Sequence, residues 1–95
     1  MPKYELEVPH NLPLPDVRAR LDRAKGKLET DYGARCTWEG DDRLQVARKG
    51  LNATVHLEPS RLKIDLELGL LLSPLAGNIR TGIAKQLTDL LNAPA

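Results

Sequence analysis

The 95-residue sequence is long enough for one hydrophobic core and too short for two, because a chain of this size buries only about 60 to 65% of its unfolded surface. Its 14 basic and 13 acidic side chains leave a net charge of +1, which excludes the strongly basic field that a phosphate backbone requires. We therefore expect a single domain over residues 1–95 with no nucleic acid as partner.

The composition also bears on the compartment. Cys36 is the only cysteine, so no intramolecular disulfide can form. The chain opens with charged residues rather than the apolar segment of a signal peptide, and no apolar run approaches the roughly 20 residues that cross a bilayer. A cytoplasmic protein without a membrane span is expected.

The first elements are a strand and a helix. Residues 3–8 alternate apolar and charged side chains, as a strand with one face in water does. Pro15 and Asp16 then suit the first turn of a helix that ends before Gly33. Its apolar stripe consists of Val17, Leu21, Ala24, Leu28 and Tyr32.

Four strands separated by turn residues are predicted next. Turns are indicated by Gly40-Asp41-Asp42, by Gly50 and by Pro59-Ser60. The inward positions would be Cys36 and Trp38, then Leu44 and Val46, then Leu51, Ala53, Val55 and Leu57, and last Leu62, Ile64, Leu66 and Leu68. Because the other face stays polar, the sheet should be antiparallel with one side in water.

A second helix is predicted at the end of the chain. Ser73 suits its N-cap and Pro74 its first turn. Gly77 and Gly82 lie inside this helix at a cost near 1 kcal/mol each, which suggests close approach of the backbone to a neighbour. Its apolar stripe consists of Leu75, Ile79, Ile83, Leu87, Leu90 and Leu91.

These elements predict an α+β fold in the order β-α-β-β-β-β-α. A single five-stranded antiparallel sheet would carry both helices packed on one face, with no linker or repeat.

Residues able to carry chemistry are few. His56 is expected on the wet sheet face, and Cys36 is expected to be a buried, inert thiol. His10, between the first strand and the helix, is expected to tie that loop, with ligand contact as the alternative. No histidine lies near a second metal ligand or a nucleophile, so we expect no enzyme, no metal and no cofactor.

A run of leucines extends beyond the alternating part of the last strand. If Leu70 and Leu72 face inward, Leu71 points to the polar side. Closure of this end into the core is one interpretation. The alternative is an apolar contact patch for a partner or a lipid surface, built from Leu12, Leu14, Leu70, Leu71 and Leu75.

Taken over nearly its whole length, the chain resembles the small bacterial polyhydroxyalkanoic acid system family. The resemblance lies in Pro9-His10-Asn11-Leu12, Tyr32-Gly33, Trp38-Glu39-Gly40-Asp41, and Leu68-Gly69-Leu70-Leu71-Leu72 with Leu75, Ile79 and Ile83. It implies an accessory role at or near polyester granules in the cytoplasm, and it transfers no catalytic residue.

Three functions remain as hypotheses. The preferred one is a non-enzymatic accessory protein that contacts the polyhydroxyalkanoate granule surface or a granule-associated protein. One alternative is a small binder of acyl or lipid ligands, a reduced relative of helix-grip folds. The other is a homodimeric structural module joined through polar sheet faces or an exposed strand edge, so the chain would be a monomer or a homodimer.

Overall fold

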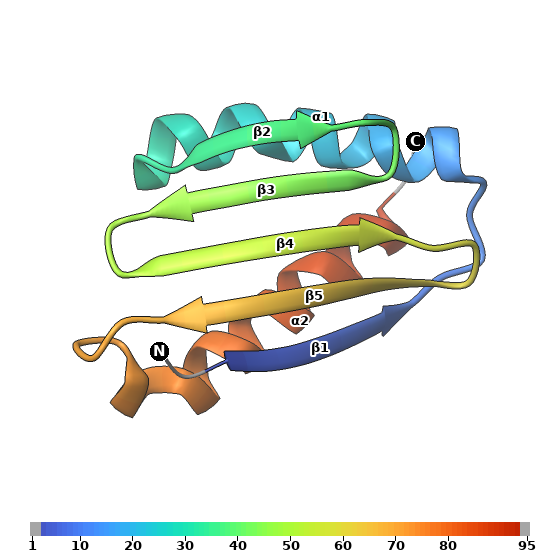
Figure 1. The fold of residues 1–95 in the computed structure, drawn as a ribbon. Coiled ribbons are helices and arrows are strands. Elements are labelled where there is room, and N and C mark those ends of the chain that lie inside the picture. Colours follow the sequence, from blue (N-terminus) through green and yellow to red (C-terminus); the bar gives the residue numbers. More distant parts are fainter. Residues whose placement is uncertain (1–2, 94–95) are drawn as a thin grey trace.

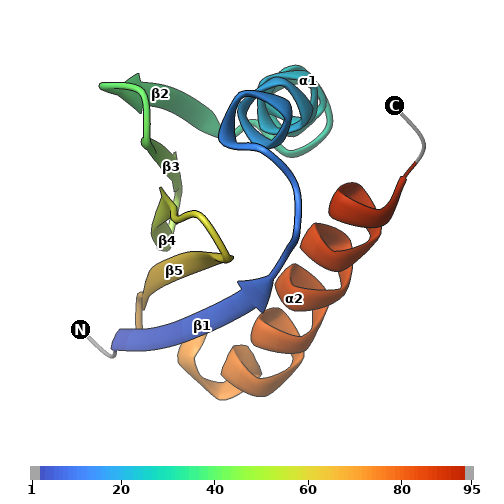
Figure 2. The ribbon, with the colours of Figure 1, turned by 90° about the vertical axis from the view of Figure 1, so that its right-hand side faces the viewer.

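The computed structural model describes residues 3–93 and shows one open antiparallel sheet covered on one face by two helices (Figures 1 and 2). The elements are β1 (Lys3–Pro9), α1 (Leu14–Tyr32), β2 (Arg35–Glu39), β3 (Arg43–Arg48), β4 (Leu51–Leu57), β5 (Arg61–Leu68), the 3-10 turn η1 (Ser73–Leu75) and α2 (Ala76–Asn92). The predicted α+β fold and its element order are confirmed.

The strand order across the sheet is β1-β5-β4-β3-β2, so β2 to β5 form a meander and β1 joins beside β5. In this pair Lys3 lies opposite Glu67 and Pro9 lies opposite Arg61. The connection through α1 therefore carries the chain from one edge of the sheet to the other (Figure 1).

The core lies between the sheet and the helices. Its largest fully buried side chains are Leu44, Leu62, Ile64, Leu66, Leu68 and Val17. Strand β5, which lies between β1 and β4, buries every second residue from Leu62 to Leu68 and so confirms the predicted alternation. On the other face the polar side chains remain accessible, because no helix or strand of residues 3–93 covers it (Figure 2).

Helix α1 packs beside β2. It ends at Gly33, which has the left-handed conformation (φ 66°) that glycine adopts without strain. The amide of Ala34 donates to the carbonyl of Leu28 at 3.3 Å and closes this end. Val17 and Leu21 of the predicted stripe are buried, whereas Tyr32 is 46% exposed. The last turn of α1 thus extends past the core.

Helix α2 packs beside edge strand β1 and is only partly covered (Figure 2). Its stripe residues Ile79, Ile83, Leu87 and Leu90 are half-buried against the core. The predicted close approach at Gly77 and Gly82 is wrong: a Cβ added at either position would meet nothing within 4 Å.

The predicted start of this helix is also wrong. Ser73 begins the short turn η1, and its hydroxyl donates to the carbonyl of Gly69 at 3.0 Å instead of accepting a helix amide. Helix α2 starts at Ala76, because the chain first has to turn from β5 back onto the helix layer.

The two helices are joined by a buried arginine. Arg20 of α1 is 6% exposed, and its Nη1 donates to the carbonyl of Leu90 at 2.8 Å and to that of Ala93. Its Nε lies 3.5 Å from Oδ1 of Asp16 and makes no hydrogen bond. Arg20 therefore satisfies carbonyls that the end of α2 would leave without partners, and its charge complements the helix dipole.

Candidate functional site

The most distinctive surface feature is the turn that follows β5. At Gly69 the chain leaves the sheet, and the Gly69 amide donates to the carbonyl of Gly50 at 2.8 Å. The Gly69 carbonyl then accepts from the amides of Leu72 and Ser73, at 3.1 and 3.0 Å, and from the Ser73 hydroxyl. These four hydrogen bonds fix the backbone of the turn.

Leu72 anchors this turn from inside. Its side chain is half-buried and packs against the core. A Cβ added at Gly50 would lie 3.3 Å from Leu72 Cδ1, and Gly50 has φ +83°, so glycine supplies both the room and the conformation.

The remaining leucines of the turn point into solvent. Leu70 is 87% exposed, Leu71 is 89% exposed and Leu75 is 47% exposed. We call these three residues the leucine turn. An inward Leu70 would need the alternation of the last strand to continue beyond Leu68. It does not continue, because β5 ends at Leu68 and the hydrogen bonds to Gly69 redirect the backbone. Of Leu70, Leu71 and Leu72, only Leu72 packs against the core.

Leu12 and Leu14 lie at the opposite end of the sheet. They follow Pro9, whose register partner is Arg61 at the start of β5, whereas the leucine turn follows the end of β5 (Figure 1). Both are half-buried against the core. The structure therefore does not gather the five proposed patch residues, and only Leu70, Leu71 and Leu75 belong to the same turn.

His10 ties the loop between β1 and α1. It is 7% exposed; its Nε2 donates to the carbonyl of Glu58 at 2.8 Å, and its Nδ1 accepts from the amide of Leu12 at 3.2 Å. With both ring nitrogens hydrogen-bonded to the backbone, neither is free for a ligand. A shallow hollow of about 300 Å³ lies beside it, lined by Pro9, His10, Asn11, Leu12, Leu91 and Asn92.

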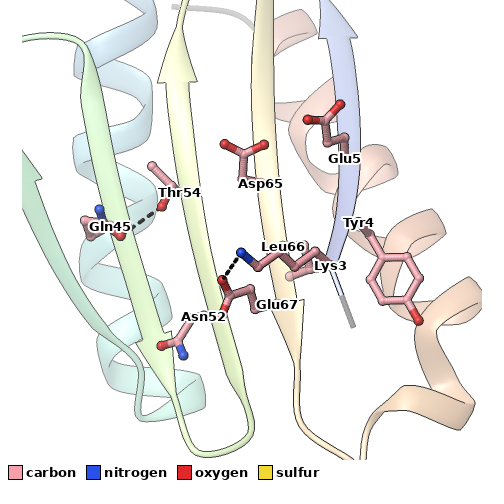
Figure 3. Close-up of a pocket in the computed structure, with 9 residues that line it drawn as sticks. All are labelled: Lys3, Tyr4, Glu5, Gln45, Asn52, Thr54, Asp65, Leu66 and Glu67. Atoms are coloured by element: carbon pink, nitrogen blue, oxygen red, sulfur yellow. Dashed lines mark hydrogen bonds and ion pairs between the residues drawn. The ribbon is translucent and has the colours of Figure 1, made fainter. Parts of the chain in front are cut away.

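The polar sheet face carries a larger hollow of about 570 Å³ across β1, β3, β4 and β5 (Figure 3). Its polar groups largely pair with each other: the Thr54 hydroxyl donates to Gln45 Oε1 at 2.9 Å, and Lys3 Nζ lies 3.6 Å from Glu67 Oε1. Nearby, His56 Nε2 lies 3.0 Å from Asp65 Oδ2. Within residues 3–93, no group of three potential metal ligands is arranged to hold an ion.

Cys36 is 5% exposed, and burial together with the charge of Glu29 raises the pKa of its thiol. A raised pKa disfavours the nucleophilic thiolate, so the structure offers no activated cysteine here.

The larger hollow lies on the polar face of the sheet, and the smaller one lies between the β1–α1 connection and the end of α2. Neither extends along the layer between the helices and the sheet. That layer is occupied by the buried aliphatic side chains, so nothing found in the described part of the chain supports an acyl pocket. In this part, no helix is long and apolar enough to cross a membrane.

Comparison with known proteins places the chain in a family. The family model described as "Putative polyhydroxyalkanoic acid system protein (PHA_gran_rgn)" matches residues 5–91, which include every strand and both helices apart from their outermost residues. No curated protein and no solved structure matches the chain. By this match, the chain belongs to the polyhydroxyalkanoic acid system protein family.

Proposed function

We propose that this protein is a non-enzymatic accessory protein of polyhydroxyalkanoate storage, and that it contacts the granule surface through the leucine turn. The proposal is supported by the family, whose name refers to this storage system, and above all by the exposure of two adjacent leucines. A single exposed leucine is ordinary. Here Leu70 and Leu71 are adjacent and almost fully exposed, and the same turn carries half-exposed Leu75.

The leucines are held outward by the fold. Because Gly69 accepts three hydrogen bonds and Leu72 is packed inward, the turn presents Leu70 and Leu71 without further ordering of the backbone. A contact made by a preformed turn loses little conformational entropy on binding.

The expected gain is moderate. Moving a leucine side chain from water into an apolar phase is worth about 1.5 to 3 kcal/mol, so Leu70 and Leu71 together supply about 3 to 6 kcal/mol. This amount suits reversible attachment to a hydrophobic polyester surface rather than permanent insertion.

Co-sedimentation with isolated granules tests the proposal. The double variant Leu70→Asp/Leu71→Asp should lose more than about 100-fold in granule affinity, because it removes the apolar contact and adds two charges. Gln86→Asp/Thr88→Asp is the matched control, since it adds the same charge at two exposed positions in the second half of α2, away from the leucine turn, and should be recovered with granules like the native protein.

The unfolding midpoint of each variant establishes that it folds. Equal recovery of folded Leu70→Asp/Leu71→Asp and native protein would remove the leucine turn from the proposed function.

A further inference from the structure

We propose that the leucine turn is the apolar part of a docking end for anionic lipid, and that Arg48 and Lys49 are its charged part. This inference rests on the proposed function and specifies the chemistry of the surface that the same end recognises.

The turns that carry the two parts are joined by a backbone hydrogen bond. Arg48 and Lys49 immediately precede Gly50 in the turn between β3 and β4. The carbonyl of Gly50 accepts from the amide of Gly69, which immediately precedes Leu70. Figure 1 shows both turns at the same end of the sheet, where β3 and β5 finish.

The cations at this end have no carboxylate partner. Arg48 and Lys49 are exposed, as is Arg35, which starts β2 opposite Ala47 at the same end. Among the described residues, no carboxylate oxygen lies within 4.0 Å of any of these three side chains.

Elsewhere on the sheet the cations are matched. Arg61 pairs with Glu7 at 2.9 Å and with Glu58 at 2.8 Å, and Lys63 lies 3.9 Å from Glu5. Glu67, near the end of β5, is already paired with Lys3. Among the described cations of the sheet and its turns, those without a carboxylate partner therefore lie at the end that carries the leucine turn. A surface that is apolar inside and negative outside complements both features.

Stable attachment of this end to a membrane requires a contribution besides that of the leucines. A small apolar anchor gives only marginal, reversible attachment to a membrane, and stable attachment takes an apolar group together with basic residues. Each lysine or arginine near an anionic surface strengthens binding by about fivefold, and the effect falls off within a Debye length.

Vesicle co-sedimentation tests the inference. Native protein should bind vesicles of phosphatidylcholine mixed with an equal amount of phosphatidylglycerol, bind phosphatidylcholine alone far more weakly, and be released by added salt. Arg48→Gln/Lys49→Gln should weaken binding to the mixed vesicles by about 30-fold. The control Arg23→Gln/Arg43→Gln removes the same charge from exposed positions on the middle of α1 and the other end of the sheet, and should bind like the native protein.

Equal binding to both kinds of vesicle, or equal losses in both double variants, would overturn the inference. Recovery on granules without binding to mixed vesicles would overturn it and leave the proposed function standing. Binding to mixed vesicles that needs Leu70, Leu71, Arg48 and Lys49, without recovery on granules, would support the inference and contradict the proposed function.

Discussion

Arg20 provides a test of how the two helices are held together. Its Nη1 donates to the carbonyls of Leu90 and Ala93, at the far end of the chain from α1, and the side chain is 6% exposed. We expect Arg20→Met to destabilise the protein, because methionine keeps the buried aliphatic stem but cannot donate to these carbonyls.

The magnitude follows from the contacts. Hydrogen bonds from a charged group contribute about 1.5 to 3 kcal/mol each, so the two bonds supply about 3 to 6 kcal/mol. Arg20 Nε is buried without a hydrogen bond, which costs about 1 to 3 kcal/mol and is partly offset by Asp16 at 3.5 Å. The middle values of these two contributions leave an expected loss in the free energy of unfolding of about 3 kcal/mol.

Urea unfolding followed by the fluorescence of Trp38, the only tryptophan, measures this loss. Trp38 is a suitable reporter, since its Nε1 donates to Asp22 at 3.0 Å and the Arg18 guanidinium lies 4.1 Å from its ring centroid. Amide exchange in the last turn of α2 should accelerate in parallel. A loss below about 0.5 kcal/mol with unchanged exchange would refute the role assigned to the carbonyl contacts.

Two further predictions concern stability. Gly77→Ala and Gly82→Ala should each raise the free energy of unfolding by about 0.5 to 1 kcal/mol, because the added methyl groups meet open space; a loss in urea unfolding would contradict this. A hydrogen bond from Arg61 holds the pKa of the Glu58 carboxyl below its ordinary value of 4.5. Its contribution to stability is thus present above that value and lost as pH falls through the lowered pKa. Glu58→Gln should lower the thermal midpoint at neutral pH and match the native protein in acid, and a constant difference across pH would disprove the linkage.

The sheet could be predicted from the sequence because its signal is local. Residues 61–68 alternate without exception, and the structure buries Leu62, Ile64, Leu66 and Leu68 accordingly. The end of β5 could not be predicted in the same way, since Leu70, Leu71 and Leu72 are chemically identical and periodicity does not separate them. Their different exposure depends on hydrogen bonds between turns that are far apart in the sequence.

The glycines show the same limit. A glycine inside a helix is equally consistent with a close neighbour and with open solvent, and only coordinates distinguish the two at Gly77 and Gly82. Gly50 and Gly69 are different, because each lies at the boundary of a strongly alternating strand, and this position indicates a turn. The sequence around Arg20 carries no sign of its role, since its carbonyl partners lie 70 and 73 residues further along the chain.

The position of β1 in the sheet has a consequence for synthesis on the ribosome. This strand emerges before the other four, yet its only strand partner among the described residues is β5, and Lys3 and Glu67 must meet across a separation of 64 residues. The β2 to β5 meander can form from neighbouring segments as they emerge, whereas β1 has to wait for the last strand. Until then its apolar side, Tyr4, Leu6 and Val8, has no β5 to pair with, so a nascent chain depends on the completion of β5 to cover β1.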